Sequence, residues 1–399
     1  MSLGHDTRLP QWYVILVFQL FDLSDHMKNK DILRSVETRR HLRFMKTKLK
    51  RKAKRAALTG DWKAALRAQY IFKKYPSKIV CRGKKKHGGL SCRLRLYVPK
   101  VVDYYNAQRY EETNIFIGKL RDCCSGGGKV FLDFIHTEQI TAAAMISFLA
   151  EVDLLTSLSP YGRNAISFNN PSNEKVESVL KQVGFYDLVQ KEERHTEEYD
   201  DVVFWQYASG IQSEPFRAKS MFGVIKKELQ ATGSRQLYRG FVEAMSNSVE
   251  HGYYACSERG EVSKWWAFAG IKDKELVAVI CDKGVGISNT LPVTQEGRIE
   301  HIFSMLGIMG RKDSAFIKAA SNLASTRTNL PNRGKGLSDI KSVIDKHGSG
   351  VVSIFSNKGH YIYRGKKGAV VDTTHDYKHS MNGTIVEWTL PLSEDSENE

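Results

Sequence analysis

Residues 238–251 read YRGFVEAMSNSVEH, and residues 276–287 read LVAVICDKGVGI. In the first stretch three apolar residues recur at helical spacing, which predicts an amphipathic helix. The other face of that helix carries Glu243 and, one turn later, Asn247. On its own this pair also fits an ordinary solvated helix face.

The second stretch is an apolar strand that runs directly into Asp282. Gly284 and Gly286 follow, so the backbone can pass close to a ligand beside the carboxylate. Taken alone, Asp-x-Gly-x-Gly also fits a simple turn.

Two further segments complete the pattern. Residues 332–337 read NRGKGL and lead into a predicted helix, so the amide groups near Gly334 and Gly336 are suited to bind phosphate. Arg333 and Lys335 could reach a phosphate or remain solvated. The last segment, GTIVEWTLP at 383–391, reads as a strand.

In order and spacing, these four segments resemble the N-box, the two glycine boxes and the final Gly-Thr strand of the GHKL superfamily of ATPases. The resemblance covers 212–392 and implies a Bergerat-type α/β sandwich, with a mixed sheet packed on helices. Within the superfamily, EAMSNSVEHGY is most similar to the anti-sigma-factor serine kinases.

The resemblance implies a role for each matching residue, with ATP and Mg²⁺ as cofactors. Asn247 would bind the metal, and Glu243 would act as general base on the group that attacks the γ-phosphate. Asp282 would accept a hydrogen bond from adenine, supported by Thr384. The glycines at 284, 286, 334 and 336 would contact the nucleotide through their backbone.

Between the glycine motifs, residues 292–331 match the position of the mobile lid of the superfamily. Helical spacing is predicted at 316–323 within this segment. We expect a lid that closes over triphosphate to convert nucleotide state into shape.

Residues 113–192 alternate strand, helix, strand, helix, which predicts a small α/β layer. Strands are expected at 129–134 and 165–168, and helices at 138–155 and 172–183. The segments VFLDF, ITAAAMISFL and VESVLKQVGFYDLV resemble a STAS domain over roughly 75 residues. The usual phosphoacceptor serine is missing from the Thr141–Ala144 stretch, so a docking or scaffold role for a protein partner is favoured over phosphorylation.

The positive charge of the chain is concentrated near its start. Residues 28–100 contain 25 Lys and Arg but three acidic residues, whereas the chain of 399 residues has a net charge of +16. Residues 1–112 are therefore predicted to be a basic, mainly helical region, with helices near 41–58 and 62–70. Interleaved aromatic residues make nucleic acid a candidate partner; docking on an acidic protein surface is the alternative.

Other features limit the protein class. The early apolar run at 12–21 is too short for a membrane helix and lacks the pattern of a secretory signal, so we expect a cytoplasmic protein without membrane contact. Six scattered cysteines suggest reduced thiols. Cys81, His87 and Cys92 could bind zinc, although their spacing matches no standard module. The acidic tail, 393–399, is predicted to be disordered.

Three functions remain open from the sequence. The first is a Mg-ATP-dependent ATPase that acts as a conformational switch. The second is a serine or threonine protein kinase acting on a partner protein, and the third is a scaffold whose nucleotide is only structural. A homodimer is compatible with all three.

Overall fold

This computed structural model describes residues 93–195, 199, 203–229, 231–253, 263–295, 299–323, 336–366 and 368–392. The basic helices, the possible zinc ligands Cys81, His87 and Cys92, most of the second glycine motif and the acidic tail lie outside these ranges. None of the helices in the described ranges has an apolar stretch long enough to span a bilayer.

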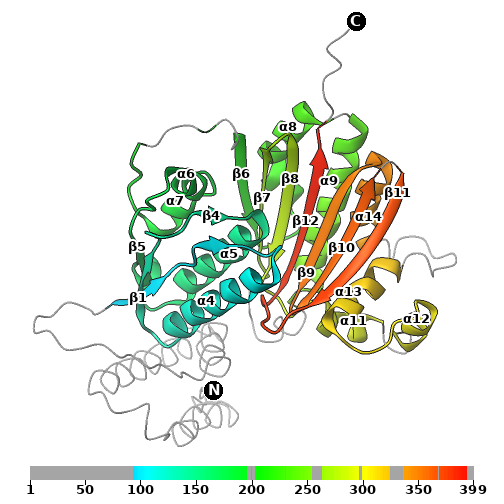
Figure 1. The fold of residues 1–399 in the computed structure, drawn as a ribbon, viewed down its shortest axis with the longest axis horizontal. Coiled ribbons are helices and arrows are strands. Elements are labelled where there is room, and N and C mark those ends of the chain that lie inside the picture. Colours follow the sequence, from blue (N-terminus) through cyan, green and yellow to red (C-terminus); the bar gives the residue numbers. More distant parts are fainter. Residues whose placement is uncertain are drawn as a thin grey trace, which may run out of the picture. The chain divides into compact units, whose positions relative to one another are not determined.

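Within the described residues, the larger sheet has seven strands in the order β11-β10-β9-β12-β8-β7-β6 (Figure 1). In chain order these are β6 (Val203–Gly210), β7 (Trp265–Lys272), β8 (Glu275–Asp282), β9 (Gly350–Ser356), β10 (Gly359–Lys366), β11 (Ala369–Asp376) and β12 (Thr384–Pro391). The strand predicted at 276–281 is confirmed as β8. Strand β6 precedes residue 212, so the sheet begins earlier in the chain than the predicted module.

Every neighbouring pair in this sheet is antiparallel, so the expected mixed sheet is wrong. The reason lies in the connections. Tight turns join β7 to β8, β9 to β10 and β10 to β11, and a hairpin turn reverses the chain. Strand β12 then enters between β8 and β9.

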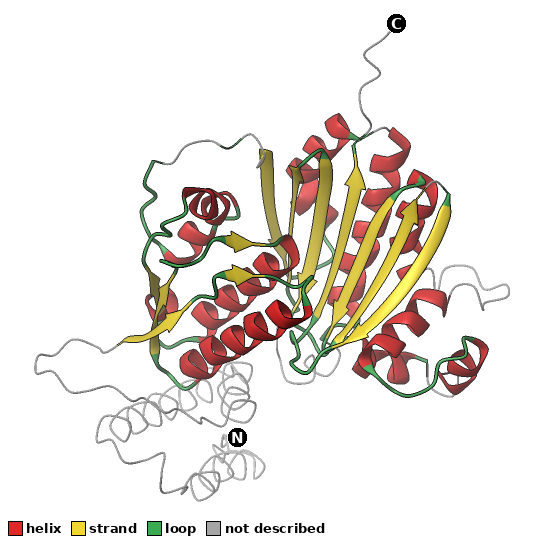
Figure 2. Cartoon of the chain, viewed as in Figure 1, coloured by secondary structure: helices red, strands yellow, loops and turns green. Residues whose placement is uncertain are grey.

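The central strands of the sheet are covered on both faces, which explains why β8 is almost continuously apolar. Side chains alternate between the faces. Trp265, Ile280 and Val386 face a core that includes helices α8 (Lys219–Glu228), α9 (Ala231–Glu250) and α14 (Gly336–His347). Their neighbours along the strands, including Trp266 and Ile385, pack instead into the core of the α/β layer. Figure 2 shows the helices that lie on the two faces of the sheet.

The α/β layer contains a parallel sheet of order β1-β3-β5 and a short parallel pair, β2 with β4. Its elements are β1 (Arg93–Tyr97), β2 (Val101–Val102), α4 (Ala107–Ser125), β3 (Lys129–Asp133), β4 (Gln139–Ile140), α5 (Ala142–Leu158), the 3-10 turn η1 (Gly162–Ala165), β5 (Ile166–Phe168), α6 (Glu174–Gln182) and α7 (Phe185–Val189). The predicted strands and the helix at 172–183 are confirmed, with ends that differ by a few residues.

Helix α5 packs the α/β layer against the larger sheet. It was predicted to begin at 138, but it begins at Ala142 because Gln139 and Ile140 pair with β2 as a strand. Its side chains are buried nearly all round, as expected for a helix with neighbours on several sides. It contacts β7, β8 and β12 of the larger sheet, within the unit formed by residues 91–124 and 128–399.

The segment predicted as a lid is largely helical in its described part. Helix α11 (Ile287–Thr294) leads into it, followed by α12 (Ile299–Met305) and α13 (Asp313–Asn322), which confirms the helix predicted at 316–323. These helices share a small core of their own around Phe303 and Phe316. A 3-10 turn, η2 (Pro215–Ala218), precedes α8.

Candidate functional site

Asp282 is the last residue of β8, and its carboxylate is buried beneath the end of the sheet, with 4% of the residue exposed. Oδ1 accepts hydrogen bonds from the amides of Gly284 (2.9 Å) and Thr384 (3.2 Å). Oδ2 accepts a longer one from the Ser248 hydroxyl, at 3.3 Å. A carboxylate offers about four acceptor positions, so this one retains capacity for another donor.

The protonation of Asp282 follows from this environment. Burial raises the pKa of Asp282 to about 6, because a charged carboxylate is poorly solvated there; hydrogen bonds from the Gly284 amide, Ser248 and the Thr384 amide act in the opposite direction. The carboxylate is therefore mainly ionised, and an acceptor, at neutral pH.

Thr384 is brought to Asp282 by strand pairing. The two residues are directly opposite each other in the β8–β12 register. The Thr384 hydroxyl lies 3.1 Å from Ser356 Oγ on β9, so three adjacent strands hold the group. The preceding Gly383 has φ 126°, and a Cβ there would lie 2.1 Å from the Asp282 carbonyl oxygen. This position requires glycine both for its conformation and for space.

The glycines after Asp282 are required by contacts within the chain. A Cβ on Gly284 would lie 2.0 Å from the carbonyl oxygen of Gly252. Gly286 has φ 84°, and a Cβ there would meet the side chain of Asn357 at 2.3 Å. At both positions the backbone passes close to other parts of the protein, which fixes the path of the loop. The predicted contact of these glycines with a nucleotide stays a prediction.

Helix α9 carries Glu243 and Asn247, and both are half-buried. Asn247 hydrogen-bonds to Glu243 through its side chain. Burial raises the pKa of Glu243, and the negative charges of Asp339 and Glu250 raise it further. A raised pKa makes a carboxylate a stronger base, which is the property that a general base requires.

The end of α9 connects these residues to the Asp282 loop. The Asn247 carbonyl accepts the amides of His251 and Gly252, both at 3.0 Å. The Gly252 carbonyl in turn accepts the amide of Val285 at 2.8 Å. One run of backbone hydrogen bonds therefore leads from α9 to the Asp282–Gly286 loop.

Helix α14 packs closely against α9 at Gly240. A Cβ on Gly240 would lie 3.0 Å from Val343 and 3.4 Å from the Asp339 carbonyl oxygen. The Arg239 guanidinium lies 3.7 Å from the Asp339 carboxylate. The start of α14 is Gly336, so the end of the second glycine motif lies on the helix that packs beside Glu243. Gly334, Arg333 and Lys335 are outside the described residues.

Sequence reasoning missed several residues that hold the site. Ser248 and Gly252 belong to the EAMSNSVEHGY segment, but only the fold shows that they touch Asp282 and the Gly284 loop. Asn357 lies in the β9–β10 turn and donates its side-chain amide to the Val285 carbonyl at 2.9 Å. Its Asn-Lys-Gly sequence signals a turn, and nothing local signals the partner.

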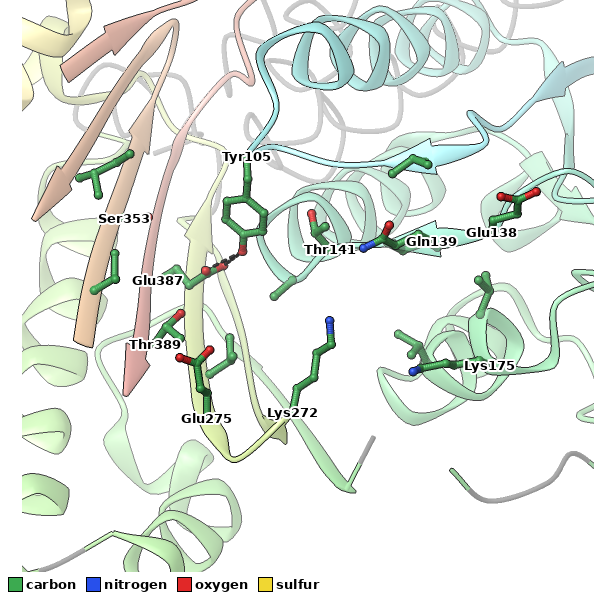
Figure 3. A pocket seen from close by; sticks show the side chains of 18 of the residues that line it. Tyr105, Glu138, Gln139, Thr141, Lys175, Lys272, Glu275, Ser353, Glu387 and Thr389 are labelled. Carbon is green, nitrogen blue, oxygen red and sulfur yellow. Dashed lines mark hydrogen bonds between the residues drawn. The ribbon is translucent and has the colours of Figure 1, made fainter. Parts of the chain in front are cut away.

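A separate cavity of about 940 Å³ lies on the opposite face of the sheet, between the sheet and β4, α5 and α6 (Figure 3). Neither Asp282 nor Thr384 lines it. At its wall the Tyr105 hydroxyl lies 2.5 and 2.7 Å from the two carboxylate oxygens of Glu387, which also accepts the amide of Ala143. Burial raises the pKa of Glu387 to about 7.

The described residues contain no group of three or more His, Cys, Asp or Glu side chains placed to bind a metal together. Cys124 and Cys281 are free thiols. In comparisons with known proteins, no family model matches this sequence and no curated protein matches it significantly.

Proposed function

We propose that the domain predicted at 212–392 binds ATP with Mg²⁺ and hydrolyses it slowly, as a conformational switch of the GHKL type. The observation that supports this most directly is the convergence on Asp282. A buried, mainly ionised carboxylate at a strand end is surrounded by Thr384, by the end of α9 and by glycine-dependent loops. These are the parts that the sequence resemblance requires to meet.

Adenine recognition would use the remaining acceptor capacity of Asp282. Its Oδ2 has the longer existing hydrogen bond, at 3.3 Å from Ser248, so this oxygen is the better acceptor for an exocyclic amino group. The two amides on Oδ1 keep the carboxylate in a fixed orientation. A fixed acceptor discriminates adenine from guanine, whose corresponding group is a carbonyl oxygen.

The phosphate end would involve α9. Asn247 offers a side-chain oxygen, a donor type that suits Mg²⁺, and the other metal ligands would be phosphate oxygens and water. Magnesium would neutralise charge on the phosphates. Glu243, adjacent to Asn247 and with a raised pKa, would accept the proton of the attacking water.

The switch would act through segments of the chain outside the nucleotide site itself. We propose the 292–331 segment as the lid and residues 28–100 as a nucleic-acid-binding region. The α/β layer, which we propose to be STAS-like, would serve as a docking element. In support of docking, the Ala143 amide at the start of α5, where a STAS phosphoacceptor would lie, donates a hydrogen bond to the Glu387 carboxylate of the larger sheet.

The test is ATP binding and turnover by the full chain with magnesium. We expect wild type to bind and slowly hydrolyse ATP, and Glu243→Gln to bind ATP without turnover. Asn247→Ala should lose magnesium-dependent affinity. Addition of DNA or RNA should change turnover if residues 28–100 act in the switch. Absence of ATP binding by wild type would refute the proposal.

A serine or threonine protein kinase is the second candidate, favoured by the match of the N-box to anti-sigma-factor kinases and by Glu243 near the expected phosphates. It predicts transfer of label from γ-labelled ATP to a partner protein, lost in Glu243→Gln. ATP binding with neither turnover nor transfer would leave a nucleotide-stabilised scaffold.

A further inference from the structure

Lys283 lies between Asp282 and Gly284, and it belongs to the opposite face of the sheet from Asp282. Successive residues of a strand alternate in direction. Asp282 therefore shares the α9 face with Ile280, while Lys283 continues the row of Val279 and Cys281 that packs into the α/β core. Adjacent residues of one motif thus contact two different layers.

The Lys283 side chain is 3% exposed and ends among groups of α5. Its Nζ donates to Ser147 Oγ at 2.8 Å and to the Met381 carbonyl at 3.1 Å. It also lies 3.8 Å from Glu151 Oε2, and Glu151 is held by Arg121 from α4. Burying an ammonium group costs free energy unless its N–H donors are hydrogen-bonded. The Lys283 ammonium group is therefore held firmly in its position beside Ser147, Met381 and Glu151.

The contacts of Lys283 also define the position of the candidate nucleotide site. Met381 lies three residues before Thr384, the residue that donates to Asp282. The Lys283 amide is itself fixed by the Tyr253 hydroxyl at 3.0 Å. Both strand ends that carry the Asp282 group are therefore attached, through one side chain, to helix α5.

We propose that Lys283 is a positioning residue that couples the nucleotide site at Asp282 to the α/β layer. This inference rests on the proposed nucleotide function. The lysine holds the Asp282–Gly284 turn in the arrangement that receives adenine, and it does so through contacts with α5. Energetic coupling between two sites is reciprocal. Nucleotide bound at Asp282 therefore makes α5 more rigid, and a partner protein that shifts α5 changes the affinity for nucleotide.

A substitution of Lys283 can test this coupling without creating a buried unpaired charge. Lys283→Met keeps the apolar stem and leaves Glu151 paired with Arg121, so no uncompensated charge is created. The matched control is Asp153→Asn. Asp153 also joins α5 to the sheet, through Trp266 Nε1 at 2.8 Å and through Lys264, but it does not touch the Asp282 turn.

The readouts are the dissociation constants for ATP and GTP analogues and the hydrogen exchange of α5 with and without ATP analogue. In Lys283→Met we expect ATP-analogue affinity to fall about tenfold, the preference for ATP over GTP to shrink, and the slowing of α5 exchange by nucleotide to disappear. Ser147→Ala, a change on α5 itself, should weaken affinity about threefold. Asp153→Asn should loosen the layers without changing either constant.

The outcomes separate the inference from the function it rests on. Wild type that fails to bind any nucleotide overturns the proposed function. Wild type that binds, with Lys283→Met and Asp153→Asn equal in affinity, overturns the coupling and leaves the function standing. Nucleotide that slows α5 exchange equally in wild type and Lys283→Met also overturns it.

Discussion

Replacing Glu387 by Gln should remove a dependence of stability on pH. Glu387 is 4% exposed and faces the Tyr105 hydroxyl and the Ala143 amide. Burial raises its pKa from 4.5 to about 7. Gln has the same shape and can still accept from both donors, but it does not ionise.

The sign and size of this pH dependence follow from the linkage between proton binding and folding. Below pH 4.5 Glu387 is protonated in both the folded and the unfolded chain, so its stabilising contribution is complete. As pH rises toward 7, the unfolded chain ionises while the folded chain still holds the proton, and stability falls. One pKa unit corresponds to about 1.4 kcal/mol, so the total loss is about 3 kcal/mol.

The assay is urea unfolding between pH 4.5 and 8, followed by tryptophan fluorescence, with the two proteins compared at each pH. The free energy of unfolding of Glu387→Gln minus that of wild type should rise by about 3 kcal/mol across this range. Glu275→Gln, at an exposed residue lining the same cavity, is the matched control and should follow wild type. A difference for Glu387→Gln that stays constant with pH would refute the reasoning.

Two other predictions concern the Asp282 loop. ATP-analogue affinity should increase as pH rises through about 6, because the ionised Asp282 carboxylate is the stronger acceptor for the adenine amino group. Isothermal titration should show that Asp282→Asn binds weakly and without this pH dependence. Gly284→Ala should destabilise the fold by about 2–4 kcal/mol and abolish nucleotide binding, since its Cβ would lie 2.0 Å from the Gly252 carbonyl oxygen. Gly223→Ala, inside α8 with nothing within 4 Å of its Cβ, should instead stabilise by up to about 1 kcal/mol in the same unfolding assay.

The local sequence pattern was sufficient to predict many of the helices and strands of this chain. Helical spacing of apolar residues located α9, α13 and α14, and short apolar runs located the strands β3 and β8. The same pattern placed Asp282 at a strand end and Glu243 one turn before Asn247. Thr384 was named only by the resemblance, and the fold pairs it directly with Asp282.

The sequence by itself therefore determined the types of many elements, since periodicity and turn chemistry are local properties, and its resemblance to a family supplied the candidate residues of the site. Only the tertiary structure decided which residues of other elements contact them. Strand order sets β12 beside β8, and close packing makes Gly284 necessary because of Gly252. The alternation that turns Asp282 toward α9 also turns Lys283 toward α5, and the identity of that partner layer depends on contacts between residues more than a hundred positions apart.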